Sequence, residues 1–282
     1  MDPDAEVTFE FVPVIRQYKS GRVERLAPIN PVPASVDAAT GVASRDVTID
    51  PATGLWARLY LPDLSARSGR RLPIALYFHG GGLVVGSAAD APEQAFLNRL
   101  AARAGALAVS VEYRLAPEHP VPASYDDAWA ALRWAATADA DPWVRDHGDA
   151  ARAFVLGFSA GWNVAHNLAL RAGARVQGMA LLHPFFLSSP SPPGDPDTAV
   201  SPLADGAPSL GCRRVLVCLA DDALAGEGRA YYGALLAGGW AAADAELLDS
   251  APADHEFHLR EPESAKAVLL MDRLAALVTG SQ

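Results

Sequence analysis

The chain has 282 residues, of which 50% are hydrophobic, so it can bury a large core and we expect a single domain. Its formal net charge is −10 and its pI is near 5.1, which leaves no basic stripe for nucleic acid or for an anionic membrane, and we expect neither as a partner. The spacing of Cys212 and Cys218 favours reduced thiols over a disulfide, and neither has metal-ligand spacing to another Cys or to a His.

The first residues include the acidic Asp2 and Asp4, and no apolar run follows them. This opening predicts no secretory signal, and no stretch of the sequence reaches the length that a membrane-spanning helix needs. We therefore expect a cytoplasmic protein, with the nucleus as an alternative location.

Residues 1–40 mix aromatic residues with prolines and show no sustained period. They predict a mostly irregular or short-helical arm that packs on a body formed by residues 41–282, and the aromatic residues argue against a disordered tail. Residues 44–50 and 55–61 alternate apolar and polar positions on either side of a turn that contains Pro and Gly. This pattern predicts a hairpin at the edge of a sheet.

Residues 73–78 are continuously apolar, as expected of a strand that is buried on both faces. Strand and helix patterns alternate from there to the end of the chain. The expected strands are 106–113, 154–156, 178–182, 215–219 and 245–248, and the expected helices are 93–104, 124–138, 160–171, 228–238 and 262–278. This alternation predicts an α/β fold with a mostly parallel sheet and helices on both faces, whose working site lies beyond the carboxyl ends of the strands.

An apolar run ends in Gly157-Phe158-Ser159-Ala160-Gly161, and a helical pattern follows. In such a strand, turn and helix the glycines permit a tight reversal, and the serine hydroxyl stands exposed above the sheet. Ser159 is therefore a candidate nucleophile, although a serine that only caps the helix is the alternative. The N–H group of Ala160 would face the negative charge that forms on a bound carbonyl oxygen.

His79-Gly80-Gly81-Gly82-Leu83 directly follows the buried strand 73–78. Three successive glycines let the backbone approach a ligand, and their N–H groups can point into a site, which predicts the second part of an oxyanion hole. The alternative is an ordinary turn. No Gly-Lys-Ser/Thr follows, so a phosphate-binding loop is not indicated, and we expect His79 to brace the glycines.

A nucleophilic serine needs an imidazole base and a carboxylate that orients the imidazole, and in this kind of fold they follow it in the order Asp or Glu, then His. Asp221 and Asp222 come directly after the strand 215–219, and His255 and His258 come after the next short strand. The residues alone do not separate the two members of either pair. The histidines that have ordinary structural explanations are His119, His147, His166 and His183.

Four motifs stand in the order of a known family. They are His79-Gly80-Gly81-Gly82, Tyr113-Arg114-Leu115-Ala116-Pro117-Glu118, Gly157-x-Ser159-Ala160-Gly161 and a final His-x-Phe. Together they resemble the hormone-sensitive-lipase group of α/β-hydrolases and, more narrowly, the plant carboxylesterases that include the gibberellin receptor. The resemblance covers nearly the whole chain and implies an α/β-hydrolase fold in which the arm of residues 1–40 serves as a lid.

The resemblance also implies roles for single residues. Ser159 would be the nucleophile, Asp222 the acid and His255 the base of a catalytic triad, which favours Asp222 over Asp221 and His255 over His258. The implied donors of the oxyanion hole are Gly81, Gly82 and Ala160. The implied enzyme is a serine carboxylesterase for small to medium esters that works through an acyl-enzyme and needs no metal or other cofactor, and we expect a monomer or a weak homodimer.

The chain departs from the family pattern beside the nucleophile. The family usually has Gly-Asp-Ser-Ala-Gly-Gly, whereas Phe158 replaces the aspartate here and Trp162 replaces the last glycine. These two side chains and Leu83 are our candidates for the substrate pocket. The Pro- and Ser-rich segment 185–208 looks shorter than its family counterpart, which helps to form that pocket, so the family's substrate class transfers poorly to this chain.

Two other functions compete with an esterase. A hormone-like binding protein of the gibberellin-receptor type would keep the serine and lack the catalytic histidine, whereas His255 is present here. A lyase of the 2-hydroxyisoflavanone dehydratase type would use a similar site to eliminate water. Substrate trials separate that reaction from ester hydrolysis.

Overall fold

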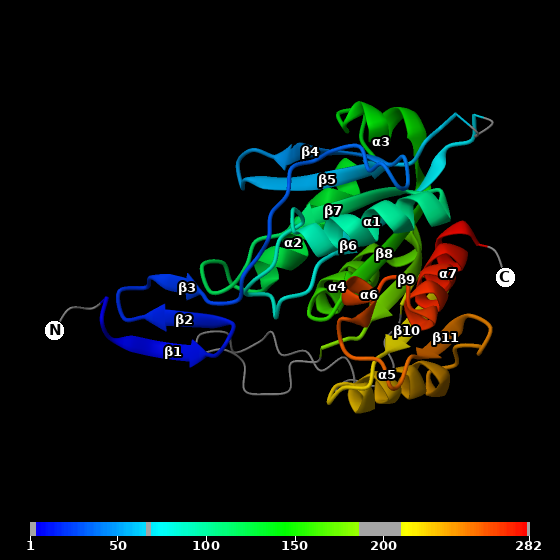
Figure 1. Ribbon diagram of the computed structural model, residues 1–282. Helices are drawn as coiled ribbons and strands as arrows, with labels where there is room; N and C mark the ends of the chain where they lie inside the picture. Colours follow the sequence, from blue (N-terminus) through cyan, green and yellow to red (C-terminus); the bar gives the residue numbers. More distant parts are fainter. Residues whose placement is uncertain (1–3, 66–68, 186–209, 281–282) are drawn as a thin grey trace.

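The centre of the structure is a sheet of eight strands (Figure 1). The computed structural model describes residues 4–65, 69–185 and 210–280, and within them the strand order is β11-β10-β9-β8-β6-β7-β5-β4. The strands are β4 (Ala43–Asp50), β5 (Leu55–Leu61), β6 (Leu72–Phe78), β7 (Leu107–Glu112), β8 (Gly148–Phe158), β9 (Val176–Leu182), β10 (Arg214–Leu219) and β11 (Ala245–Asp249). β5 is antiparallel to both β4 and β7, and the other neighbours are parallel. The expected mostly parallel sheet with a hairpin at its edge is confirmed.

Burial explains why β6 and β8 lie in the middle of this sheet. Every residue of β6 is buried, and so is every residue of β8 from Ala153 to Phe158. Strands that are apolar on both faces suit the interior of a parallel sheet and no other place in it. Because β6 and β8 are parallel neighbours, the residues that follow them emerge side by side at the same edge.

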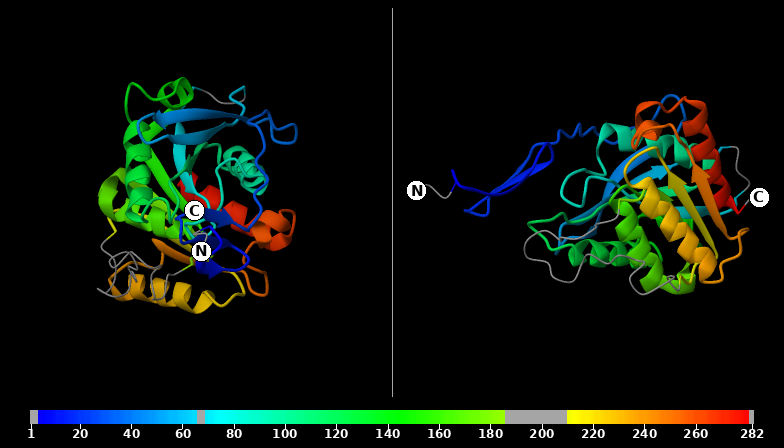
Figure 2. Two further views of the ribbon diagram at one scale, coloured as in Figure 1. Left: turned by 90° about the vertical axis from the view of Figure 1, so that its left-hand side faces the viewer. Right: turned by 90° about the horizontal axis from the view of Figure 1, so that it is seen from below.

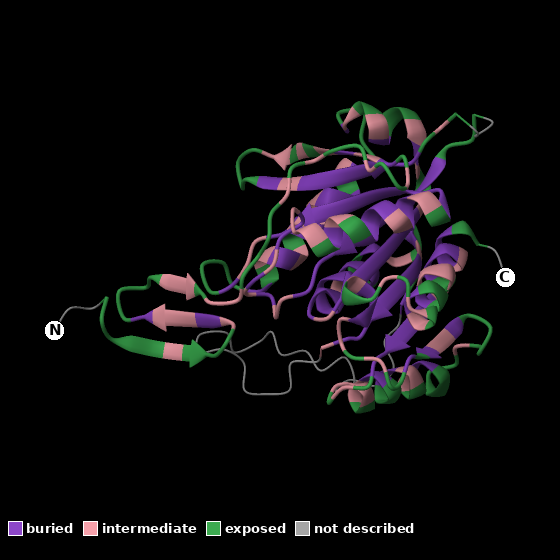
Figure 3. Ribbon diagram, viewed as in Figure 1, coloured by how far each residue is buried: buried purple, intermediate pink, exposed green. Residues whose placement is uncertain are grey.

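Helices cover both faces of the sheet (Figures 1 and 2). One face carries α1 (Ala91–Ala104), α6 (Phe257–Arg260) and α7 (Ala265–Thr279), and the other carries α2 (Pro122–Trp134), α3 (Pro142–His147), α4 (Gly161–Ala172) and α5 (Ala225–Ala237). Side-chain caps begin the long helices α1 and α7, since Asp90 and Ser264 accept N–H groups of the first turns. The buried residues gather between the sheet and these helices (Figure 3).

The amino-terminal arm differs from the expectation. It contains a separate antiparallel sheet of β1 (Val7–Phe11), β2 (Ile15–Tyr18) and β3 (Val23–Arg25), which lies to one side of the body (Figures 1 and 2). The prediction of an irregular or short-helical arm is therefore wrong there, and the alternation of apolar and polar residues in β1 was the signal for a strand. The later part of the arm does pack on the body, because the N–H group of Val32 donates to the Ala89 carbonyl at 2.9 Å.

Smaller differences concern the ends and the shortest helices. No helix was expected at α3 or α6, which are too short for a helical period to show, and α2 ends at Trp134 instead of residue 138. The segment 185–208, predicted to be shorter than its family counterpart, lies outside the described residues from 186 onward. Among the helices of the described part of the chain, none has the length and apolar character to cross a membrane.

Candidate active site

The turn between β8 and α4 carries Ser159. Two glycines allow this turn, because a Cβ on Gly157 would lie 2.3 Å from the carbonyl oxygen of Gly161, and a Cβ on Gly161 would lie 2.2 Å from that of Phe78. Ser159 itself has a φ of 50°, a left-handed conformation that is strained for any residue with a side chain. Its N–H group donates to the Leu182 carbonyl on β9 at 2.9 Å, which holds the strained turn against the sheet.

Ser159, His255 and Asp222 form a hydrogen-bonded chain. The distance from Oγ of Ser159 to Nε2 of His255 is 2.9 Å, and that from Nδ1 of His255 to Oδ2 of Asp222 is 2.7 Å. A carboxylate can only accept, so Nδ1 carries the ring proton, and the neutral ring accepts the Ser159 hydroxyl through Nε2. The side chains of His255 and Asp222 are 27% and 16% exposed, so both are largely sheltered but in contact with solvent.

The structure brings together one member of each pair that the residues alone left open. Oδ1 of Asp222 also accepts the N–H group of Leu224 at 2.8 Å, which fixes the carboxylate plane, whereas Asp221 is exposed. His258 is only 2% exposed, and its ring packs against that of Phe158. The contact with Ser159 is therefore made by His255, and the contact with His255 by Asp222.

The loop of residues 79–85, called the glycine loop below, lies against Ser159. A Cβ on Gly80 would come within 3.1 Å of the Ser159 Cβ. Gly81 and Gly82 have φ values of 109° and 64°, which glycine adopts at no steric cost. Within the described residues, no acceptor takes the N–H groups of Gly81, Gly82 or Ala160, so these donors are available to a negatively charged oxygen beside the serine.

His79 contacts the glycine loop as expected. Its Nδ1 donates to the Gly80 carbonyl at 2.7 Å, and its ring stacks on Tyr113 with 4.4 Å between the ring centroids. The Tyr113 hydroxyl donates in turn to the His79 carbonyl at 2.8 Å. The motif that begins at Tyr113 therefore supports the loop from behind, which gives it a physical role beside the nucleophile motif.

A buried carboxyl also lies near this loop, and the sequence analysis did not single it out. Glu93 of α1 accepts a hydrogen bond from the Tyr77 hydroxyl at 2.6 Å. Burial raises the pKa of Glu93 to about 7, although the hydrogen bonds from Tyr77 and from the Gly80 backbone favour its charged form. The available signal was a glutamate among the mostly apolar residues of the buried helix face.

His183 is a second residue that the sequence analysis set aside. Its Nδ1 donates to the main-chain carbonyl of His255 at 2.7 Å, so it holds the segment that carries the imidazole. Burial lowers the pKa of His183 to about 4, which keeps it neutral, and its φ is 46°. It follows β9 directly, just as Ser159 follows the neighbouring β8, and that position at the carboxyl edge was the signal available in the sequence.

The three candidate pocket residues are all buried. Phe158, Trp162 and Leu83 are 4%, 0% and 2% exposed. The Trp162 ring packs on His166 of its own helix and on Tyr231 of α5, with 5.5 and 5.9 Å between the ring centroids. A direct contact of any of the three with a substrate stays a prediction.

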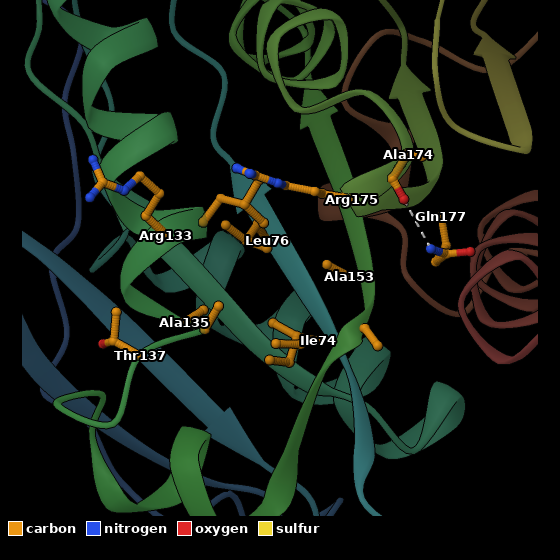
Figure 4. A pocket seen from close by; sticks show the side chains of 13 residues that line it. Ile74, Leu76, Arg133, Ala135, Thr137, Ala153, Ala174, Arg175 and Gln177 are labelled. Carbon is orange, nitrogen blue, oxygen red and sulfur yellow. Dashed lines mark hydrogen bonds between the residues drawn. The ribbon is translucent and has the colours of Figure 1, made fainter.

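A cavity of about 430 Å³ opens at the other end of the sheet, where β6, β8 and β9 begin (Figure 4). Its wall consists largely of small and apolar side chains with two arginines, among them Ile74, Leu76, Ala135, Ala153, Arg133 and Arg175. None of the residues that line it is Ser159, His255 or Asp222. In the part of the sequence that the structure describes, no group of three His, Cys, Asp or Glu side chains could hold a metal ion.

Comparisons with known proteins agree with the fold. A family described as "alpha/beta hydrolase fold" matches residues 75–195. Tuliposide A-converting enzyme 1 of Tulipa gesneriana is 39% identical over 98% of this chain and 79% of its own length. Probable carboxylesterase 2 of Arabidopsis thaliana is 35% identical, with 97% and 96% covered. A solved esterase of Pyrobaculum calidifontis is 30% identical, with a TM-score of 0.69 and 84% of each chain covered.

Proposed function

We propose that this member of the plant carboxylesterases of the α/β-hydrolase fold, a carboxylic ester hydrolase, acts on small to medium esters. The proposed catalytic residues are Ser159, His255 and Asp222. The observation that carries this proposal is the hydrogen-bonded chain, in which Oγ of Ser159 lies 2.9 Å from Nε2 of His255. That distance is within reach of proton transfer from a hydroxyl to an imidazole.

In the proposed reaction, Oγ of Ser159 attacks the carbonyl carbon of the ester while Nε2 of His255 takes the hydroxyl proton. The tetrahedral intermediate collapses, the bond to the alcohol oxygen breaks, and His255 gives that proton to the leaving alcohol. Water then attacks the acyl carbon with His255 as its base. The bond from this carbon to Oγ of Ser159 breaks, His255 returns the proton to Oγ, and the acid leaves. Asp222 holds the reactive tautomer and stabilises the imidazolium in both halves of the cycle.

The N–H groups of Gly81, Gly82 and Ala160 would stabilise the negative oxygen of each tetrahedral intermediate. They come from the loop after β6 and from the start of α4, which the sheet places beside each other. The dipole of α4 adds to the Ala160 donor, because its positive end points at the site. A single donor of this kind is worth about 10²- to 10³-fold in kcat.

We also propose that the arm of residues 1–40 acts as a lid. Its support is Arg25, at the end of β3, whose Nε donates to the Val84 carbonyl in the glycine loop at 2.7 Å. The same guanidinium pairs with Glu118 at 2.7 Å. A truncated protein without residues 1–40 should show altered KM values across esters of increasing acyl length, and unchanged KM values would count against a lid.

The decisive experiment for the function is turnover of p-nitrophenyl acetate and butyrate by the wild type, Ser159→Ala and His255→Ala. Both variants should lose about 10⁴-fold or more in kcat, because the nucleophile and the base act as a unit. Circular dichroism and the unfolding midpoint serve as controls for folding. A folded Ser159→Ala variant with undiminished turnover would overturn the mechanism.

The same assay separates the competing functions. A wild type that folds but turns over no ester would shift the proposal to a hormone-like binding protein and to ligand-binding screens. Elimination of water from 2-hydroxyisoflavanones would support a dehydratase. Because relatives that are 39% identical are named tuliposide A-converting enzymes, tuliposide A is one of the first natural substrates to try.

The location and the assembly state are further proposals. We expect the protein in the cytoplasm or the nucleus, and a fluorescent fusion in plant cells tests this expectation. The tulip relatives are named chloroplastic or amyloplastic, so a plastid signal is the result that would overturn it. Gel filtration over a range of concentrations tests the expected monomer or weak homodimer.

A further inference from the structure

Phe158 stands immediately before the nucleophile, where the family usually has an aspartate. Its ring meets that of His258 edge-on, with 4.7 Å between the centroids, and lies 5.4 Å from that of His255 and 6.1 Å from that of His183. A Cβ on Gly80 would lie 2.9 Å from this ring, so the ring also touches the glycine loop. Phe158 therefore fills the space between three imidazoles and the loop beside Ser159.

Two of these histidines have ring nitrogens without a partner among the described residues. They are Nε2 of His183 and both ring nitrogens of His258, in side chains that are 1% and 2% exposed. Because His183 donates through Nδ1, its Nε2 is an unprotonated acceptor in the neutral ring. The rings of Phe96 and Phe158 pack against His258 in T-shaped contacts, and these apolar rings give a charged imidazolium no oxygen or nitrogen acceptor.

The surroundings favour the neutral form of both rings. Burial is the main cause: it lowers the pKa of His183 to about 4 and the pKa of His258 well below its usual value. The charged or titratable groups that face the pair are Arg99 from α1, Asp222 from the loop after β10, and Asp254 and His255 from the loop before α6. The Arg99 cation opposes protonation of His258, and both oxygens of Asp222 already accept hydrogen bonds.

We propose that Phe158 keeps a carboxylate away from His183 and His258 and so holds both rings neutral, which leaves Asp222 as the carboxylate that orients His255. An aspartate at position 158 would place a negative charge among the three imidazoles and favour their protonated forms. Phe158 is thus a positioning residue that acts through its neighbours. This inference rests on the proposed function, in which His255 is the base.

The first test needs no catalytic activity. Histidine ring signals of the labelled protein are followed by NMR between pH 5 and 9, with His183→Gln and His258→Gln used for assignment. In the wild type neither ring should titrate in this range, and in Phe158→Asp at least one should titrate with a midpoint above about 6. Titration of either ring above pH 5.5 in the wild type would overturn the proposal even if the esterase activity is present.

The second test is the pH dependence of kcat/KM for p-nitrophenyl butyrate in the wild type and in Phe158→Asp, Phe158→Asn and Phe158→Leu. Asparagine has the size and polarity of aspartate without its charge, and leucine keeps the site apolar. The low-pH limb should move up by about one pH unit in the aspartate variant and stay in place in the other two, which is about a ten-fold loss in kcat/KM at pH values below the limb. An equal shift in all three variants would show that packing, and not charge, is responsible and would overturn the proposal. If neither the wild type nor any variant hydrolyses esters, the esterase proposal fails. The NMR titration still tests this inference in that case.

Discussion

The two ends of the central sheet are built differently. At the carboxyl ends of β6, β8 and β9 lie Leu83, Ser159 and His183, with φ values of 64°, 50° and 46°, and in the described ranges no other residue with a side chain has a positive φ. At the amino ends the irregularities are register shifts of β8 against β6 and β9, and the cavity of about 430 Å³ lies beside them.

This difference shows that the strained backbone conformations of the described residues lie at the carboxyl ends of the strands. A left-handed conformation costs about 1–3 kcal/mol per residue, so it persists only where surrounding contacts impose it. Both Ser159 and His183 have such contacts, since their N–H groups donate to Leu182 and Cys218 on the neighbouring strands at 2.9 Å. The strained backbone aims both side chains at His255, whereas a register shift only adjusts how strands fit together.

The largest expected effect at the carboxyl edge is that of Asp222→Asn. An amide can donate to Nδ1 of His255 and so select the tautomer that cannot accept the Ser159 proton, and we expect kcat to fall by about 10⁴-fold. The matched control is Asp221→Asn, because this neighbour is exposed and does not contact the imidazole. Steady-state kinetics with p-nitrophenyl butyrate measure both. Equal losses in the two variants would show that the hydrogen-bonded chain does not determine the rate.

The fold was predictable where burial leaves one interpretation. The apolar run of β6 suits only a central strand, and the alternation in β4 suits a half-buried strand at the edge of the sheet. The arm was mispredicted because β1 and β3 have 5 and 3 residues, which is too few for their alternation to stand out among the prolines.

The candidate site was predictable where its geometry is local. The turn at Ser159 depends on glycines within two residues of it, so the spacing alone indicates it. Asp221 and Asp222 could not be separated, because the conformation of the loop after β10 decides which carboxylate reaches the imidazole. His183 was set aside because its role comes from a contact with His255, 72 residues further along the chain.

A pair of glycine substitutions compares the two ends directly. A Cβ on Gly81, whose φ is 109°, would lie 2.2 Å from the Val85 carbonyl oxygen, so Gly81→Ala must shift the loop and its N–H donors. We expect kcat/KM to fall by about 10²-fold. Gly173 follows α4 at the amino end of β9, with a φ of 56°, a ψ of −133° and open space around its Cβ position, so Gly173→Ala should cost about 1–3 kcal/mol of stability and leave the rate unchanged. A comparable rate loss in Gly173→Ala would contradict the division between the two ends.

The smallest expected effect belongs to the cavity at the amino ends. Ala153 of β8 lines it and is 1% exposed (Figure 4). The two added methyl groups of Ala153→Val would fill part of the cavity, and valine favours a strand, so the free energy of unfolding should rise by less than about 1 kcal/mol. The rate should stay within about two-fold, because the cavity shares no residue with the Ser159 chain. Urea unfolding and steady-state kinetics on the same preparation check both expectations. A rate loss without a loss of stability would mean that packing at one end of β8 alters the strained turn at the other, since β8 is the element that joins them.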